Sequence, residues 1–68
     1  MFDKDEFDIM LIRRKKAIQG CAKKLGLSLK GFYNKYNGLT EFKASEITTL
    51  SGYLDLSASD THKIFLSK

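Results

Sequence analysis

Short amphipathic segments interrupted by glycine constrain the fold of this chain more than any other feature of its sequence. Between residues 18 and 25 the apolar side chains stand three and four positions apart, at Ile18, Cys21, Ala22 and Leu25. This spacing lines one face of an α-helix. Gly26 follows directly, and glycine readily adopts the positive φ with which many helices end. Because only Leu27 and Ser28 separate Gly26 from the next helical segment, we expect the two helices to cross at a steep angle.

The rest of the chain also divides into short helices, and no segment has a strong strand pattern. The predicted helices cover residues 4–14, about 16–25, 29–37 and 44–54, followed by a short fifth helix that carries Ile64 and Phe65. Three of these helices have a clear N-cap residue, namely Asp3, Ser28 and Ser57. The predicted core is built on the aromatic residues Phe7, Phe32, Tyr36, Phe42 and Phe65. The sequence therefore predicts an all-α fold, a compact bundle of about five short helices.

The size of the chain limits what it can do. Its 68 residues, of which 43% are hydrophobic and none is proline, predict a single domain over residues 1–68. A chain of this size buries only about 60% of the surface that is exposed in its unfolded state. Little area is left for a deep substrate cleft beside the core. We therefore expect a protein that is not an enzyme and that takes no small-molecule ligand.

Residues that usually hold metals or carry out catalysis are scarce. Cys21 is the only cysteine, so an intrachain disulfide is impossible and a zinc cluster is not supported. Its place on the apolar stripe predicts a buried thiol rather than a nucleophile. His62, the only histidine, has no catalytic partner at a recognisable spacing, which predicts a surface residue. We expect no cofactor and no metal.

Neither a signal peptide nor a membrane helix is predicted. The longest apolar run, residues 9–12, is far shorter than the roughly 20 residues that span a bilayer. The first eight residues are acidic, whereas a signal peptide begins with a basic region. Together with the single cysteine, these features favour the cytoplasm as the location.

Positive charge is concentrated in the middle of the chain. The net charge of +4 divides into −3 for residues 1–12, +8 for residues 13–43 and −1 for residues 44–68. The middle segment carries nine lysines and arginines against one acidic residue, Glu41. Such a segment favours an acidic partner such as nucleic acid. Taken alone, the basic run of residues 13–16 is more typical of a solvated helix end.

The segment 18–38, IQGCAKKLGLSLKGFYNKYNG, resembles the helix-turn-helix of the phage Cro and CI repressors. The residues that carry this resemblance are Ala22 at a close helix contact, Gly26 and Leu27 in the turn, Ser28 as a cap and Phe32 as an inward anchor. The resemblance continues through residues 41–54 to Ile64 and Phe65, so that it covers about residues 7–66. It implies a small Cro-like repressor of phage or prophage type, which binds operator DNA and acts by occupying it.

The third predicted helix supplies the expected DNA-reading surface. When Phe32 and Tyr36 face the core, the outward arc of this helix carries Leu29, Lys30, Tyr33 and Asn34. The resemblance places its base-reading positions on the same arc. Lys30 is expected to donate to guanine O6 or N7, Asn34 to pair with adenine, and Leu29 to pack on a thymine methyl group.

Contacts to the DNA backbone are expected from the start of the second helix and from the turns. The predicted phosphate-binding residues are Lys16, Gln19, Lys35, Asn37 and Lys43. Lys43 also stands where a Ser, Thr or Asp cap is expected before the fourth helix.

The resemblance further implies an inverted-repeat operator that is read by two protomers, because one helix reads too few base pairs. A homodimer, formed in solution or on the DNA, is therefore expected. Its predicted contact is the apolar end of the fifth helix, Ile64, Phe65 and Leu66.

Three departures from the family pattern keep other functions open. Ile18 replaces a glutamine that braces the phosphate and the reading helix in many members, and Gly31 replaces a usual Ser or Thr in the reading helix. Gly20 lies inside the second helix at a cost of about 1 kcal/mol relative to alanine.

The alternative function is a protein-interaction module on the same scaffold, such as an antirepressor or an inhibitor of a host DNA-processing complex. RNA binding or non-specific nucleoid binding is a third candidate function, because the basic segment of residues 13–43 permits it.

Overall fold

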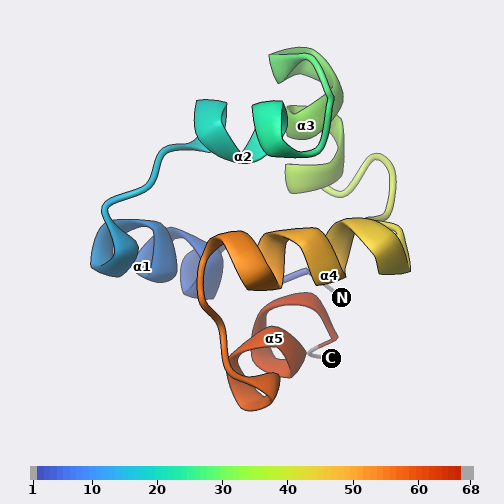
Figure 1. Ribbon diagram of the computed structural model, residues 1–68. Helices are drawn as coiled ribbons and strands as arrows, with labels where there is room; N and C mark the ends of the chain where they lie inside the picture. Colours follow the sequence, from blue (N-terminus) through green and yellow to red (C-terminus); the bar gives the residue numbers. More distant parts are fainter. Residues whose placement is uncertain (1, 67–68) are drawn as a thin grey trace.

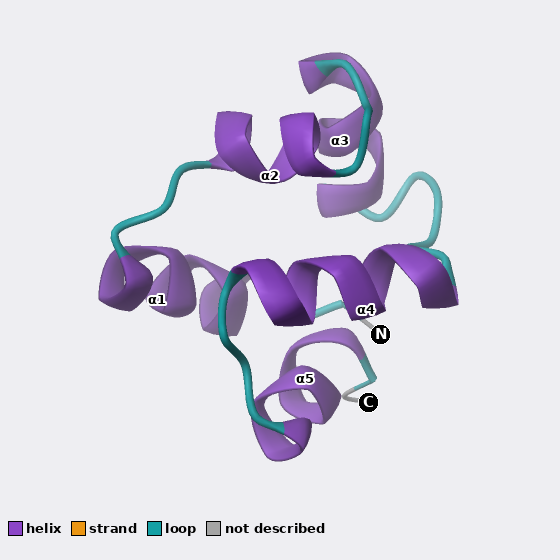
Figure 2. Ribbon diagram, viewed as in Figure 1, coloured by secondary structure: helices purple, strands orange, loops and turns teal. Residues whose placement is uncertain are grey.

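The computed structural model describes residues 2–66 and contains five α-helices, with no strand in that range (Figure 1 and Figure 2). The helices are α1 (Lys4–Arg14), α2 (Ile18–Lys24), α3 (Leu29–Tyr36), α4 (Ala44–Tyr53) and α5 (Ala58–Phe65). The predicted all-α class is confirmed. α2 is shorter than the expected helix over residues 16–25, because Lys15 takes a left-handed conformation (φ 55°) after α1 and Ala17 is extended.

The helices begin and end at residues that the sequence indicated. The side-chain oxygens of Asp3, Ser28 and Ser57 accept the backbone N–H groups of Glu6, Gly31 and Asp60, at 3.1, 3.1 and 3.0 Å. Each bond satisfies one of the amide groups that the first turn of a helix leaves without a partner. After α2 and α3 the chain turns at Gly26 (φ 71°) and Gly38 (φ 82°), a conformation that favours glycine.

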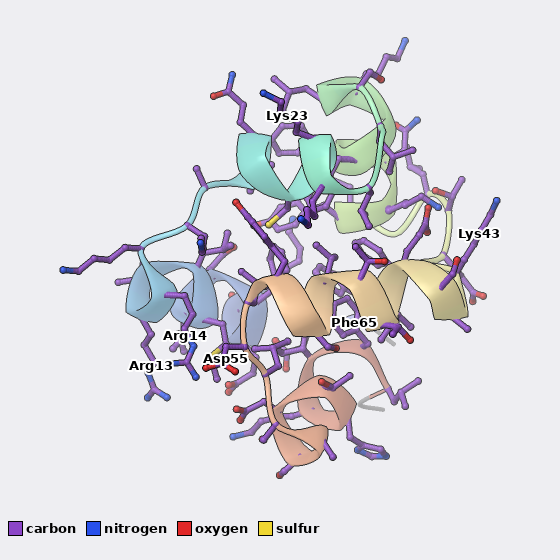
Figure 3. The ribbon with its side chains drawn as sticks, in the orientation of Figure 1. Arg13, Arg14, Lys23, Lys43, Asp55 and Phe65 are labelled. Carbon is purple, nitrogen blue, oxygen red and sulfur yellow. The ribbon has the colours of Figure 1, made fainter. Side chains whose placement is uncertain are left out.

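α4 runs across the middle of the molecule and supports the other helices. In Figure 1, α2 and α3 lie above α4, and α5 lies below it. α2 packs against α3 and α4, whereas α5 packs against α1 and α4. Arg14 joins α1 to the end of α4, since its Nε donates to the carbonyl of Leu54 (3.0 Å) and its Nη2 to that of Asp55 (3.2 Å; Figure 3). Part of the basic run thus stabilises a helix C-terminus, where cations are favoured.

Side chains from all five helices form one buried cluster. Its members are Phe7, Met10, Leu11, Cys21, Ala22, Phe32, Leu50, Leu54, Ile64 and Phe65. Three of the five aromatic residues predicted for the core are therefore buried. The other two, Tyr36 and Phe42, are partly buried against the cluster.

Phe2 contributes to the core although it lies outside every helix, which is why helical periodicity did not predict it. The ring centroid of Phe2 lies 4.9 Å from that of Phe42 and 5.3 Å from that of Phe7. The backbone N–H of Asp3 donates to the carbonyl of Ile64 (2.7 Å), which holds this segment against α5. The first and last described residues consequently lie near each other (Figure 1).

The dimer contact predicted at the end of α5 is wrong. Ile64 and Phe65 are only 1% and 6% exposed, because they fill the core of their own protomer, and Leu66 alone is exposed. Side chains that are buried within one protomer are not free to contact a second one. Of the predicted contact, only Leu66 is accessible to a second protomer.

Gly20 leaves room for the hydroxyl group of Tyr53, which lies at the end of α4. A Cβ atom at this position would lie 2.5 Å from the hydroxyl oxygen of Tyr53, well inside van der Waals contact. The glycine therefore has a packing role, which offsets the helix-propensity cost expected from the sequence.

We expect Gly20→Ala to destabilise the protein by about 1 kcal/mol, because overpacking costs about 1–3 kcal/mol and the gain in helix propensity is only about 1 kcal/mol. In a Tyr53→Phe background the collision is absent, and the same substitution is expected to stabilise the fold by about 1 kcal/mol. Urea denaturation of the four proteins of this double-mutant cycle measures the difference. An equal effect of Gly20→Ala with and without the hydroxyl would contradict the packing role.

Candidate nucleic-acid interface

α3 is held in place by its inward face. Phe32 is fully buried, and the hydroxyl of the partly buried Tyr36 donates to the Asp8 carboxylate of α1, with oxygen–oxygen distances of 2.8 and 3.0 Å. Burial, the bond to Asp8 and the nearby negative charge raise the pKa of Tyr36 to about 12, so the hydroxyl remains a donor at neutral pH. The ring of Phe32 and the bond to Asp8 together fix the rotation of α3 about its axis.

The opposite face of α3 is open. Leu29 and Tyr33 are 41% and 40% exposed, and Lys30 is exposed beside them. Asn34 is half-buried and lies at the edge of this face. The Tyr33 ring stands edge-on to that of Tyr36, with centroids 5.8 Å apart, which limits its movement. The four predicted base-reading residues therefore share one side of α3, and Asn34 is the least accessible of them.

The predicted phosphate-binding residues come from three places in the fold. Lys16 and Gln19 lie at the start of α2, Lys35 and Asn37 at the end of α3, and Lys43 just before α4. All except Lys35 are exposed, and Figure 3 shows Lys43 projecting from the start of α4. Lys4 adds a further cation near the end of α3, because its ammonium donates to Oδ1 of Asn37 (3.1 Å).

Lys35 is engaged in an internal ion pair. Its ammonium lies 3.0 Å from a carboxylate oxygen of Glu46 and donates to the carbonyl of Glu41 at 3.0 Å. The two paired side chains are only 11% and 14% exposed. Contact between Lys35 and a phosphate requires this pair to break. Lys35 is thus the weakest of the phosphate candidates.

Glu46 explains how α4 can begin after Lys43, whose side chain has no acceptor. The carboxylate of Glu46 accepts the backbone N–H of Lys43 (2.8 Å) and caps the helix from within. Burial alone would raise the pKa of the Glu46 carboxyl, but the bond from Lys43 and the ammonium of Lys35 outweigh it and hold the pKa below its ordinary value. The side chain of Lys43 is not needed for capping and remains exposed.

Tyr53 brings together two lysines at the side of α2. The ammonium of Lys16 lies 4.7 Å from the centroid of the Tyr53 ring, and that of Lys24 lies 5.8 Å from it. Cation–π contacts at exposed sites are worth about 0.5–1 kcal/mol each, so the ring favours a fixed place for both charges. Sequence reasoning missed Tyr53. No local pattern indicated it, because Tyr53 lies at the end of α4, far along the chain from both lysines.

The basic middle segment is divided between structural and free cations. Arg13 and Arg14 lie at the end of α1, away from α3, whereas Lys23 lies on α2 close to α3 (Figure 3). Arg14 is already bonded to carbonyl groups. The exposed lysines of α2, α3 and their flanking loops that take part in no ion pair within residues 2–66 include Lys16, Lys23, Lys24, Lys30 and Lys43.

Groups suited to metal binding or nucleophilic chemistry are few in the described part of the chain. No group of three His, Cys, Asp or Glu residues within residues 2–66 is placed to hold a metal ion. Cys21 is buried, as predicted, and burial raises the pKa of its thiol to about 11 against a smaller opposing effect of Lys16. His62 is exposed, also as predicted.

Within residues 2–66, no helix has the length and apolar character needed to cross a membrane.

Comparison with protein-family models, with curated proteins and with solved structures finds no match to this chain. The likeness of residues 18–38 to phage repressors therefore rests on those residues alone. A function has to be argued from α3 and its surroundings.

Glu46→Gln is expected to destabilise the protein by about 1–2 kcal/mol at neutral pH, because it weakens a charge-assisted bond and removes the ion pair with Lys35. The pKa of Glu46 is lower in the folded protein than its ordinary value of 4.5. Its contribution is therefore complete above that value and is lost as the pH falls through the folded pKa. Thermal denaturation between about pH 3 and pH 7 should show a steeper acid loss in the wild type than in the variant.

The matched control is Glu41→Gln, which removes the same charge from an exposed side chain that takes part in no ion pair within residues 2–66. This control is expected to change the stability by no more than about 0.5 kcal/mol. Identical acid profiles for the wild type and Glu46→Gln would mean that the carboxylate does not stabilise the start of α4.

Proposed function

We propose that this protein is a sequence-specific DNA-binding regulator of the Cro-like kind, which inserts α3 into the major groove of operator DNA. In this proposal α2, residues 25–28 and α3 act as a helix-turn-helix. Regulation follows from occupancy of the operator, without catalysis or a cofactor. Two protomers read the two halves of an inverted repeat.

The observation that carries the proposal is the division of α3 into a packed face and an open face. Phe32 anchors one side, while Leu29, Lys30 and Tyr33 are exposed on the other. A helix about 10–12 Å across fits the major groove of B-DNA, which is about 12 Å wide. The first turn of α3 contains no acidic residue, so the positive end of the helix is free to favour phosphate. These features suit a helix that presents its N-terminal half to DNA.

The proposed contacts follow from the chemistry of the exposed side chains. Lys30 donates to guanine O6 or N7, Leu29 packs on a thymine methyl group, and Asn34 bonds to adenine after a small rotation out of its half-buried position. Tyr33 contacts a neighbouring base or phosphate through its hydroxyl. The backbone phosphates are bound by Lys16, Gln19, Asn37 and Lys43, to which the position of Tyr53 adds Lys24.

A protein-interaction module is the second candidate function, and one observation favours it. Leu29 and Tyr33 place apolar surface in the middle of the open face of α3, and such a surface also suits a protein partner. The two functions differ in what they predict for duplex DNA. Gel-shift titrations with selected and random duplexes at physiological salt separate them, because an interaction module has no sequence preference.

Lys30→Ala and Asn34→Ala are each expected to reduce the preference for a selected operator over random duplex by about 1–3 kcal/mol, because each variant leaves one base unread. A binding-site selection first identifies the operator, and gel-shift titrations then measure both affinities for each variant. Lys63→Ala, which removes an exposed charge on α5 outside the proposed DNA-binding surface, is the control and should leave the preference unchanged. Equal reductions in affinity for selected and random duplexes would show that neither residue reads a base.

Lys16→Ala and Lys24→Ala are expected to weaken binding to every sequence alike and to flatten the slope of log affinity against log salt by about 0.9 each. Lys35→Ala should leave this slope unchanged, because in the wild type the Lys35 ammonium is paired with Glu46 and does not neutralise a phosphate. Fluorescence anisotropy on one duplex between about 50 and 200 mM salt measures the slopes. A slope that Lys24→Ala does not alter would remove Lys24 from the set of phosphate-binding residues.

A further inference from the structure

The exposed face of α1 carries two large apolar residues that the proposed function does not use. Ile9 is 42% exposed and Ile12 is 77% exposed. They stand three positions apart, so their side chains are neighbours on the helix surface. Neither residue belongs to the open face of α3, and within residues 2–66 both keep a large exposed apolar surface.

Charges of opposite sign flank this apolar pair along the helix. Asp5, Ile9 and Arg13 stand four positions apart and therefore form one row on the surface of α1. Asp5 and Arg13 are both exposed, and within residues 2–66 neither takes part in an ion pair or a side-chain hydrogen bond. Figure 3 shows the side chain of Arg13 pointing away from the rest of the molecule. The other charges of α1 are mostly engaged, since Asp8 accepts from Tyr36 and Arg14 donates to the end of α4.

We propose that this face binds a second copy of the chain through an antiparallel pairing of the two α1 helices. The row is self-complementary, because a twofold axis beside Ile9 places Ile9 next to Ile9 of the partner and Asp5 opposite Arg13 of the partner. The same axis repeats this ion pair on the other side of the contact. Interfaces with twofold symmetry have this property, in that one patch meets itself and each contact occurs twice.

The geometry of helix packing supports the pairing. Rows of residues four apart form ridges, and the commonest packing of two helices interdigitates such ridges at a crossing angle of about −50°. The helices then approach most closely at Ile9, while the long side chain of Arg13 spans the wider gap to Asp5 of the partner at each end. Ile12 lies beside the row and extends the apolar centre.

The size of the patch makes this a weak association. Two isoleucines and one charge pair from each protomer cover much less than the roughly 800 Å² per partner of a standard stable interface. We therefore expect a monomer at micromolar concentration and a dimer that is populated as the concentration approaches millimolar. A high local concentration, such as that on a shared duplex, has the same effect.

Sedimentation equilibrium of the full chain without DNA tests the proposal. The weight-average mass of the wild type should rise from one protomer toward two with concentration. Arg13→Asp and Asp5→Arg each place like charges opposite one another, and each should weaken self-association by about tenfold or more. An equimolar mixture of these two variants restores both opposite-charge pairs in a heterodimer and should associate like the wild type.

Two controls separate this face from general changes in charge or hydrophobicity. Lys23→Asp reverses a positive charge on α2, and Leu39→Ser removes an exposed apolar side chain outside α1 that is 75% exposed. Both should leave the association unchanged, whereas Ile12→Ser should weaken it about tenfold. Circular dichroism confirms that each variant is folded.

A wild-type mass that stays monomeric up to millimolar concentration would overturn the proposal, as would a mixture of the two charge variants that remains monomeric. Equal effects of Ile12→Ser and Leu39→Ser would also overturn it. These outcomes are independent of the proposed DNA binding, because no duplex is present in the experiment.

Discussion

The burial of Phe32 in the aromatic cluster is the contact on which the rest of the structure depends. Its ring centroid lies 6.1 Å from that of Phe7 and 5.8 Å from that of Phe42, so α3 is tied both to α1 and to the segment that leads into α4. A domain of this size has few buried side chains, and each large ring accounts for a substantial share of the apolar surface removed from water. Once Phe32 points inward, the helical repeat turns Leu29 and Lys30 outward. The open face of α3 is thus a consequence of core packing.

Part of the positive charge of the middle segment is used by the fold itself, which the sequence alone does not show. Arg14 closes the end of α4, and Lys35 holds the start of α4 through Glu46. These contacts fix α4 at both ends, and α2 packs against this helix. The remaining exposed lysines, among them Lys30 and Lys43, are free to meet an acidic partner. A net charge therefore overstates the part of a basic segment that can bind DNA, because some cations are used by the fold itself.

The fold presents two outward faces on different helices. The face on α3 combines one lysine with apolar and amide groups, whereas the face on α1 has isoleucine at its centre and opposite charges at its ends. α1 and α3 are joined through the bond that the Tyr36 hydroxyl donates to Asp8, and this bond is among the causes that raise the pKa of Tyr36 to about 12. The proposed groove binding and the proposed self-association use no residue in common, so substitutions can separate them. Two separate faces suit a small protein for which both DNA binding and dimerisation are proposed.

Local order was determined by the sequence alone. Caps at Asp3, Ser28 and Ser57 and the turn at Gly26 depend on neighbours within a few positions, so that helical periodicity and cap chemistry are sufficient to predict them. The outward arc of α3 followed from the same periodicity. Contacts between distant positions depend on how the helices pack. Phe2 lies beside Phe42, and Gly20 lies close to Tyr53. Lys35 pairs with Glu46, and Ile64 and Phe65 are buried in the core. Such contacts join residues from opposite ends of the chain, as in the bond from Asp3 to Ile64, and no local pattern encodes which surfaces meet once the helices pack.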